Sequence, residues 1–328
     1  MRTRLCDILG IDVPIIGAPF GPWDSVDLAA AICAAGGLGS LGTAVRPVPQ
    51  LQQQWARLRA RTSRPFAVNH TTRPFDEAAF AATLAARPAA VSYHLGDPGD
   101  LVARAHDAGI RWIQQVMDVG QARDAVRNGV DVVIAQGGEA GGHSGSVSTF
   151  TLVPQVVDIA GDIPVVAAGG IVDGRGLAAA LSLGAQGVAM GTRFLASDEM
   201  AVNAEWKQMI VAAGSADAVH TEVLEVLLPP YNRAHYPARA RVLRTPFLDR
   251  WTGHDAELVE QAPHLTSAIV EAVLAGDGHQ YVPFAGQSAG LVHDVRPAGR
   301  IIRETVQQAE QILAGLSRPT EPVGSAGP

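Results

Sequence analysis

The chain has 328 residues, a formal net charge of −7 and 47% hydrophobic residues, a length and composition that suit one large α/β domain. The mild acidic excess disfavours nucleic-acid and anionic-membrane partners, which would require a basic surface. There is no apolar run of the roughly 18 residues that a membrane span needs and no N-terminal signal pattern, so a cytoplasmic protein is expected.

Short apolar runs alternate with helical patterns through the first 190 residues. The runs are nearly all apolar, as is typical of parallel strands covered on both faces. Strands are expected at Val13–Pro19, Leu38–Gly42, Phe66–Asn69, Ala90–Tyr93, Trp112–Val116, Val132–Gln136, Pro164–Ala168 and Gly187–Met190. Eight strands at about one per 25 residues predict an α/β fold of the closed (β/α)8 TIM-barrel type. The alternative is a doubly wound open sheet, but the dinucleotide fingerprint typical of that fold does not follow the first strand.

Helices are expected between these strands, several opening with Ser, Asp or Pro and ending at Gly or Asn. They are predicted at Ser25–Ala35, Val48–Arg61, Asp76–Ala86, Pro98–Ala108, Val119–Asn128 and Asp173–Leu183. After the eighth strand the alternation stops, which predicts a helical insertion, or lid, before a closing helix at Pro297–Gly315. The expected organisation is a barrel of residues 1–198 and 286–316, an inserted substrate domain of residues 199–285, and a disordered tail of residues 317–328 rich in Pro, Gly and Ser.

Active sites of such barrels lie at the carboxyl ends of the strands. The seventh strand ends in Ala168-Gly169-Gly170-Ile171 and the eighth in Met190-Gly191-Thr192. Glycines there allow the backbone to approach an anion, and the loops after strands seven and eight are the usual phosphate site of the fold. The paired glycines therefore predict phosphate binding rather than simple tight turns.

The loop after the sixth strand, Gln136–Gly145, contains five glycines and one imidazole, His143. Glycines leave little side chain to pack, so the loop backbone is expected to lie against a ligand. His143 would face that ligand and act as a general base at neutral pH. For Glu139, a hydrogen bond that braces the loop is at least as good an interpretation as acid–base catalysis.

Other strand ends add weaker indications of a flat ring. Asn69, with His70 beside it, and Gln115 could satisfy the polar edge of a heterocycle, and the segment Gly17–Phe20 could pack against its face.

Charge and cysteine content point to no further site. Arg233, Arg239, Arg241 and Arg244 form a local cluster that we expect in a solvated or phosphate-proximal loop. Cys6 and Cys33 have neither disulfide nor metal-binding spacing, so no metal is expected.

Taken together, these segments resemble the nitronate monooxygenase family over nearly the whole chain. The resemblance rests on Pro14-Ile-Ile-Gly-Ala-Pro19, Asn69, Glu139-Ala-Gly-Gly-His143-Ser-Gly145, Ala168-Gly-Gly-Ile171, Met190-Gly-Thr-Arg-Phe194 and Gly286-Gln-Ser-Ala-Gly290. It implies non-covalently bound FMN and oxidation of alkyl nitronates by O2, with His143 taking the α-proton of neutral nitroalkanes. The implied cofactor-binding residues are Ala18, Pro19, Phe20, Asn69, Gln115, Gln136, Gly141, Gly142, Gly169, Gly170, Met190, Gly191, Thr192 and Gln287.

The resemblance leaves the reaction open, because one fold supports several chemistries. The first alternative is an NAD(P)H-dependent flavin reductase of enoyl thioesters or quinones. A non-redox aldolase or isomerase would commonly place lysine or paired carboxylates at strand ends, and no predicted strand end here carries a lysine. The expected partners are a small-molecule substrate and O2, and a homodimer is compatible with the sequence. The insertion is expected to form the substrate wall, with His220, Tyr231 and Tyr236 as candidates.

Overall fold

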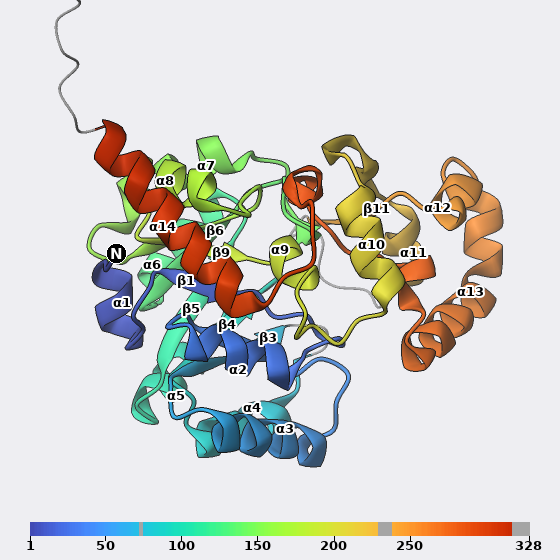
Figure 1. The fold of residues 1–328 in the computed structure, drawn as a ribbon. Helices are drawn as coiled ribbons and strands as arrows, with labels where there is room; N and C mark the ends of the chain where they lie inside the picture. Colours follow the sequence, from blue (N-terminus) through green and yellow to red (C-terminus); the bar gives the residue numbers. More distant parts are fainter. Residues whose placement is uncertain (72–74, 229–237, 317–328) are drawn as a thin grey trace, which may run out of the picture.

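A computed structural model describes residues 1–71, 75–228 and 238–316 of the chain. Its centre is an eight-stranded parallel sheet with the strand order β1-β9-β8-β6-β5-β4-β3-β2 (Figure 1). The two edge strands meet, since Gly17 donates a backbone hydrogen bond to Leu38 and Leu38 donates one to Ile15. The sheet is therefore closed, and the predicted (β/α)8 barrel is confirmed.

All eight predicted strands are present, with ends that differ from expectation by at most two residues. They are β1 (Ile15–Gly17), β2 (Gly39–Gly42), β3 (Phe66–Thr71), β4 (Ala90–His94), β5 (Arg111–Val116), β6 (Val132–Gln136), β8 (Val165–Ala168) and β9 (Gly187–Met190). Along each strand, side chains alternate between the barrel interior and the surrounding helices. This alternation determines which residues reach the ligand end of the barrel.

One helix follows each strand and packs on the outside of the barrel. These helices are α2 (Val26–Ala34), α3 (Val48–Arg61), α4 (Glu77–Ala86), α5 (Leu101–Asp107), α6 (Val119–Arg127), α7 (Thr149–Ala160), α8 (Gly174–Ser182) and the last helix, α14 (Ala298–Leu316). Ser25, Asp76, Asp118 and Asp173 cap α2, α4, α6 and α8 by accepting hydrogen bonds from backbone N–H groups, as their positions before each helix predict. Helix α14 contacts α8 and α2 and completes the ring.

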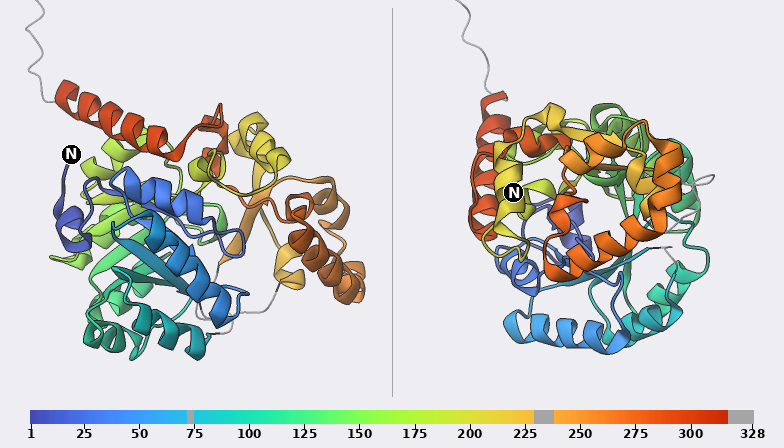
Figure 2. Two further views of the ribbon diagram at one scale, coloured as in Figure 1. Left: turned by 60° about the horizontal axis from the view of Figure 1, so that its bottom comes forward. Right: turned by 90° about the vertical axis from the view of Figure 1, so that its right-hand side faces the viewer.

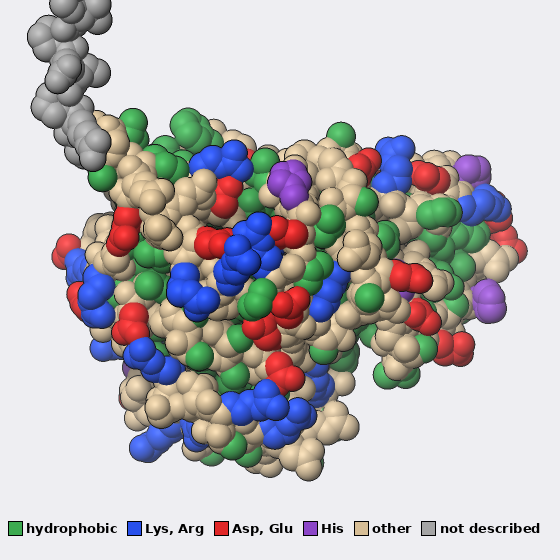
Figure 3. All heavy atoms as spheres, viewed as in Figure 1, with side chains coloured by type: hydrophobic (Ala, Val, Ile, Leu, Met, Phe, Trp, Pro, Cys, Tyr) green, Lys and Arg blue, Asp and Glu red, His purple; other side chains and the backbone are tan. Residues whose placement is uncertain are grey.

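A short helix, α1 (Arg4–Leu9), closes the amino-terminal end of the barrel. Its side chains Leu5, Cys6 and Leu9 join a buried cluster with inward-facing strand residues such as Ile113 and Ile134. The opposite end, where the strands terminate, is therefore where the barrel can receive a ligand. On the face seen in Figure 3, acidic and basic side chains are interspersed. Within the described ranges, no helix is both long and apolar enough to cross a membrane.

The insertion, residues 199–285, lies over the carboxyl end of the barrel, as the right-hand view of Figure 2 shows. It contains α10 (Ala204–Ala212), α11 (Val223–Leu227), α12 (Pro246–Trp251) and α13 (Asp255–Ala275), with α9 (Thr192–Leu195) just before it, and the short 3-10 turns Ser215–Asp217 and Gly278–Gln280. A third such turn, Gln287–Leu291, lies between the insertion and α14. The predicted helical insertion also contains strands. Two strands, β10 (Ala218–Thr221) and β11 (Arg239–Leu243), pair antiparallel with each other, and β11 also pairs with β7 (Gly142–Ser144).

Candidate active site

Polar side chains line the barrel interior at the carboxyl ends of three strands. Asn69, Gln115 and Gln136 each lie two residues beyond an inward-facing apolar residue, so strand alternation directs them into the barrel as well. Asn69 and Gln136 are buried, whereas Gln115 is half-buried. The structure thus places the three amides that the sequence indicated at the carboxyl end of the barrel interior.

The amide groups at this end are partly satisfied by the protein. Asn69 donates through Nδ2 to the hydroxyl of Ser92 at 3.0 Å and to the Ser92 carbonyl at 3.2 Å. Gln136 Oε1, by contrast, is buried and accepts no hydrogen bond among the described residues. Because a buried acceptor without a donor costs free energy, this oxygen fits a ligand that supplies an N–H or O–H group.

Backbone N–H groups after β8 and β9 form the second part of the site. Gly169 and Gly170 have φ values of 100° and 75°, which glycine adopts without strain. In the described part of the chain, the N–H groups of Gly170, Gly191 and Thr192 donate no hydrogen bond to the protein. The two turns are those that hold phosphate in this fold, so their free donors fit an anionic phosphate.

The glycine loop packs mainly against protein. A Cβ on Gly137 would lie 2.3 Å from the Thr149 nitrogen, one on Gly138 would lie 3.0 Å from the Gly145 carbonyl oxygen, and one on Gly141 would lie 2.6 Å from the Gly286 nitrogen. Gly142, with a φ of 75°, has open space where its Cβ would be. At Gly141 the close approach that requires a glycine is to the backbone of residues 285–286, and contact of the Gly141 backbone with a ligand stays a prediction.

Glu139 braces this loop. Its carboxylate accepts hydrogen bonds from the Thr149 backbone N–H at 2.9 Å and from the Thr149 hydroxyl at 2.8 Å. The Glu139 carbonyl also accepts from the Gln287 N–H at 2.9 Å. A carboxylate at the first turn of α7 is favourable because it meets free N–H groups and the positive end of the helix dipole. These contacts support the brace rather than acid–base work.

His143 lies in β7, opposite Ala240 of β11. It is half-buried, and its ring centroid is 5.8 Å from that of Phe284. Phe284 in turn contacts Trp23 edge-on, with centroids 6.0 Å apart. The imidazole is thus held at the junction of barrel and insertion beside partly exposed aromatic rings, a setting that suits an apolar substrate carbon next to a proton acceptor.

The other predicted cofactor-binding residues, from the segment after β1 and from the region after β9, also lie at the carboxyl end of the barrel. Half-buried Ala18 donates from its N–H to the Met190 carbonyl, and Phe20 donates from its N–H to the buried Asp24 carboxylate at 2.7 Å. Pro19 stands between them and is half-buried. Thr192 accepts through its hydroxyl from the Gly286 N–H at 2.9 Å, which ties the end of β9 to the turn that carries Gln287.

Two residues beside the site face away from it. Met190 is a poor candidate for a side-chain contact, since alternation points it outward into the core between strands and helices, where it is 1% exposed. Its carbonyl is already bonded to Ala18. His70 also points outward, with Nε2 2.9 Å from the Thr83 hydroxyl. Burial lowers the pKa of His70 to about 4, so it is a neutral structural residue.

His220 is not placed as a substrate-wall residue. Its ring nitrogens contact Ser144 and Arg241 on the opposite face of the small sheet from His143. Tyr231 and Tyr236, the other two candidates, lie outside the described residues. Arg241, expected in a solvated or phosphate-proximal loop, instead lies in strand β11 and is buried, with 8% exposure.

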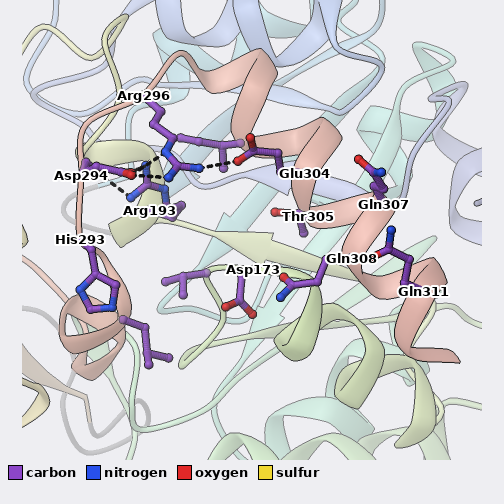
Figure 4. Close-up of a pocket in the computed structure, with 13 residues that line it drawn as sticks. Asp173, Arg193, His293, Asp294, Arg296, Glu304, Thr305, Gln307, Gln308 and Gln311 are labelled. Carbon is purple, nitrogen blue, oxygen red and sulfur yellow. Dashed lines mark hydrogen bonds and ion pairs between the residues drawn. The ribbon is translucent and has the colours of Figure 1, made fainter. Parts of the chain in front are cut away.

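A cavity of about 460 Å³ lies between the turn that precedes α8, Arg193 of α9, the segment that precedes α14 and α14 itself (Figure 4). Arg193 and Arg296 converge on Asp294 there, and Arg296 also pairs with Glu304. Its charges are therefore already paired within the protein. The cysteines are no better placed for chemistry: both are buried, and burial raises the pKa of Cys33 to about 11.

A polar barrel end, unpaired backbone donors after β8 and β9, and a histidine beside apolar rings suit an enzyme site for a ligand with a ring and a phosphate. The nitronate monooxygenase family model matches residues 2–83 and 70–308. The chain therefore belongs to the nitronate monooxygenase family and is a flavin-dependent oxidoreductase.

Individual relatives agree with this assignment. A nitronate monooxygenase of Paraburkholderia phytofirmans is 30% identical over 96% of this chain and 97% of its own. A (3aS,4S,5R,7aS)-5-hydroxy-7a-methyl-1-oxo-octahydro-1H-indene-4-carboxyl-CoA dehydrogenase of Rhodococcus jostii is 39% identical over 66% of this chain, and the match spans 62% of that protein.

Solved structures show the same likeness in three dimensions. FabK from Thermotoga maritima superimposes with a TM-score of 0.85 at 35% identity, covering 96% of this chain and 98% of its own. A nitroalkane oxidase from Streptomyces ansochromogenes superimposes with a TM-score of 0.81 at 30% identity, covering 95% of this chain and 99% of its own.

Proposed function

We propose that the chain binds FMN and oxidises alkyl nitronates with O2, and that it also accepts neutral nitroalkanes after His143 removes their α-proton. The observation that carries the proposal is the place of His143, which shares the ligand end of the barrel with the polar amides and the unpaired backbone donors after β8 and β9. Full-length likeness to a nitronate monooxygenase and to a nitroalkane oxidase supports this choice of substrate.

The residues fit FMN in both of its parts. The N–H groups of Gly170, Gly191 and Thr192 would hold the phosphate, and Gln136 Oε1 would accept from the ring or the ribityl chain. Asn69 and Gln115 line the same interior. When bound, the flavin supplies the redox step by taking electrons from the nitronate and passing them to O2. A purified protein that is colourless and takes up no FMN would contradict this proposal at its first step.

The chain's own contribution is proton transfer and placement. A neutral imidazole at position 143 accepts the proton from the α-carbon of a nitroalkane, and the C–H electron pair remains on the substrate as the nitronate. Phe284 and Trp23 offer apolar surface beside this imidazole, which reduces the access of water to the carbanionic product.

The variant His143→Asn tests the role of the base. It should keep its FMN and lose about 100-fold or more in kcat/KM with neutral nitroethane, because positioned general bases contribute about that much. With ethyl nitronate, which is already ionised, the loss should be much smaller. Steady-state rates with both substrates check this, and equal losses would argue against proton abstraction by His143.

A second candidate is a flavin enzyme that exchanges electrons between a pyridine nucleotide and an acyl thioester. The 39% identity to a dehydrogenase named for a carboxyl-CoA substrate favours it, although the match spans 62% of that protein. The two candidates differ in what reduces the flavin, so they can be separated without knowing the natural substrate.

A further inference from the structure

Strand β7, which carries His143, is held by the insertion rather than by the barrel. Its only recorded strand partner among the described residues is β11, in the antiparallel register Gly142–Arg241, His143–Ala240 and Ser144–Arg239. The eight-stranded sheet does not include β7. The position of the imidazole therefore depends on a segment about 100 residues further along the chain.

The two faces of this small sheet have different partners. Strand alternation places His143 on the face of Ala240, which belongs to the apolar core of the insertion. Ser144 and Arg241 lie on the other face, together with His220, which is paired with Arg241 across β10 and β11. One face thus presents the imidazole, and the opposite face carries a polar cluster.

That cluster is a connected set of hydrogen bonds around a buried guanidinium. Arg241 donates through Nε to the Gly138 carbonyl at 3.0 Å and through Nη1 to the Ala218 carbonyl at 2.6 Å. Its Nη2 lies 3.4 Å from His220 Nδ1, and His220 Nε2 lies 3.0 Å from Ser144 Oγ. Because arginine can only donate, Nδ1 accepts and Nε2–H donates to the serine.

The charge state of the cluster is consistent with this direction of bonding. Burial, followed by the charges of Arg241 and Arg239, lowers the pKa of His220 to about 4, so the ring is neutral at physiological pH. Arg241 forms no direct ion pair within the described ranges; burial lowers the pKa of its guanidinium, and the charge of Glu139 offsets part of that effect. A buried cation is costly to retain, so its bonds to two carbonyls from separate segments call for a structural explanation.

We propose that Arg241, His220 and Ser144 form a clamp that fixes β7 to the glycine loop and to the insertion, and thereby positions His143 for its reaction. Arg241 ties the glycine loop at Gly138 to β10 at Ala218, and the His220–Ser144 bond anchors the residue next to His143. These are positioning residues, since they are proposed to act through His143. The catalytic part of this inference rests on the proposed function, whereas the clamp itself does not.

The test compares Arg241→Gln with Arg239→Gln in the flavin-loaded full-length protein. Arg239 lies two residues away on the same strand, and its side chain is 63% exposed, so its loss should leave β7 in place. Hydrogen exchange measured by mass spectrometry over residues 138–146 should be about tenfold faster in Arg241→Gln, as expected when hydrogen bonds from a charged donor are lost. Arg239→Gln should match the parent protein.

Kinetics provide the second readout. Arg241→Gln should lower kcat/KM for neutral nitroethane by about 100-fold through kcat, with a small change in KM, because a misplaced base costs about that much. The loss with ethyl nitronate should be much smaller, and Arg241→Lys should recover part of the lost rate by bonding one carbonyl. If Arg241→Gln does not fold, Ser144→Ala removes one oxygen only and should show the same pattern to a smaller degree.

The outcomes separate the clamp from the proposed function. Unchanged exchange over residues 138–146 in Arg241→Gln, or in Ser144→Ala if that variant is needed, would overturn the clamp. Faster exchange with equal losses on nitroethane and ethyl nitronate would overturn the positioning of His143. A parent protein that turns over neither compound would overturn the proposed function, and the exchange measurement would still decide the clamp.

Discussion

The substitution Gly141→Ala tests the packing of the glycine loop against the turn that follows the insertion. Its new Cβ would lie 2.6 Å from both the Ala285 carbonyl carbon and the Gly286 nitrogen. Carbon atoms in contact are normally about 3.5–4.0 Å apart, so the two backbones must separate by about 1 Å. Both neighbours are main-chain atoms, and neither can move aside as a flexible side chain would.

Gly141→Ala should lower both the free energy of unfolding and the rate of the reaction. Overpacking of this kind costs about 1–3 kcal/mol, measured as a fall in the free energy of unfolding in urea. The separation also stretches the hydrogen bond from the Gln287 N–H to the Glu139 carbonyl, which is 2.9 Å long. Since the loop carries His143, a shift of about 1 Å should lower kcat/KM with nitroethane by about 100-fold.

The control is Gly315→Ala in α14, where an added Cβ meets nothing within 4 Å. It should stabilise the protein by up to about 1 kcal/mol, because alanine favours a helix over glycine, and leave turnover unchanged. A Gly141→Ala protein with parental stability and parental rates would refute the packing argument.

Two further predictions concern His70 and Glu139. Burial lowers the pKa of His70 from 6.5 to about 4, so between these pH values the unfolded chain binds a proton that the native state does not. The stability due to this difference is complete above pH 6.5 and is lost as the pH falls to about 4. Over that pH range the free energy of unfolding of the parent, measured in urea, should therefore fall by up to about 3 kcal/mol relative to that of His70→Leu. A difference between the two proteins that does not change with pH would contradict this. Glu139→Ala removes the two hydrogen bonds to Thr149 and should lower the free energy of unfolding in urea by about 1–2 kcal/mol. It should reduce turnover less than His143→Asn does. An equal loss of turnover would make Glu139 a catalytic residue.

The sequence was sufficient to predict the barrel because local signals agreed with the global fold. Apolar runs of four to seven residues alternated with capped helices, and the caps Ser25, Asp76 and Asp173 accept the bonds that their positions predict. The same alternation also indicates which strand-end residues face inward. Applied to each strand, it separates Asn69 from His70 and excludes the Met190 side chain from the ligand end.

Non-local contacts could not be predicted in the same way. Strand β7 has three residues, one of them glycine, and its register with Ala240 joins positions 97 residues apart, so neither propensity nor period indicates it. The partner of Gly141 is likewise distant in the chain. Arg241 lay in a run of arginines typical of a surface, and only the pairing of β10 with β11 shows why it is buried.

The central claim is that a nitronate, and not a pyridine nucleotide, delivers electrons to the flavin of this protein. Anaerobic mixing of the flavin-loaded enzyme with ethyl nitronate and, separately, with NADH, while flavin absorption is recorded, tests it directly. We expect rapid bleaching by the nitronate, return of the colour on admission of O2, and no comparable response to NADH. Rapid bleaching by NADH with no response to the nitronate would contradict it and favour the reductase.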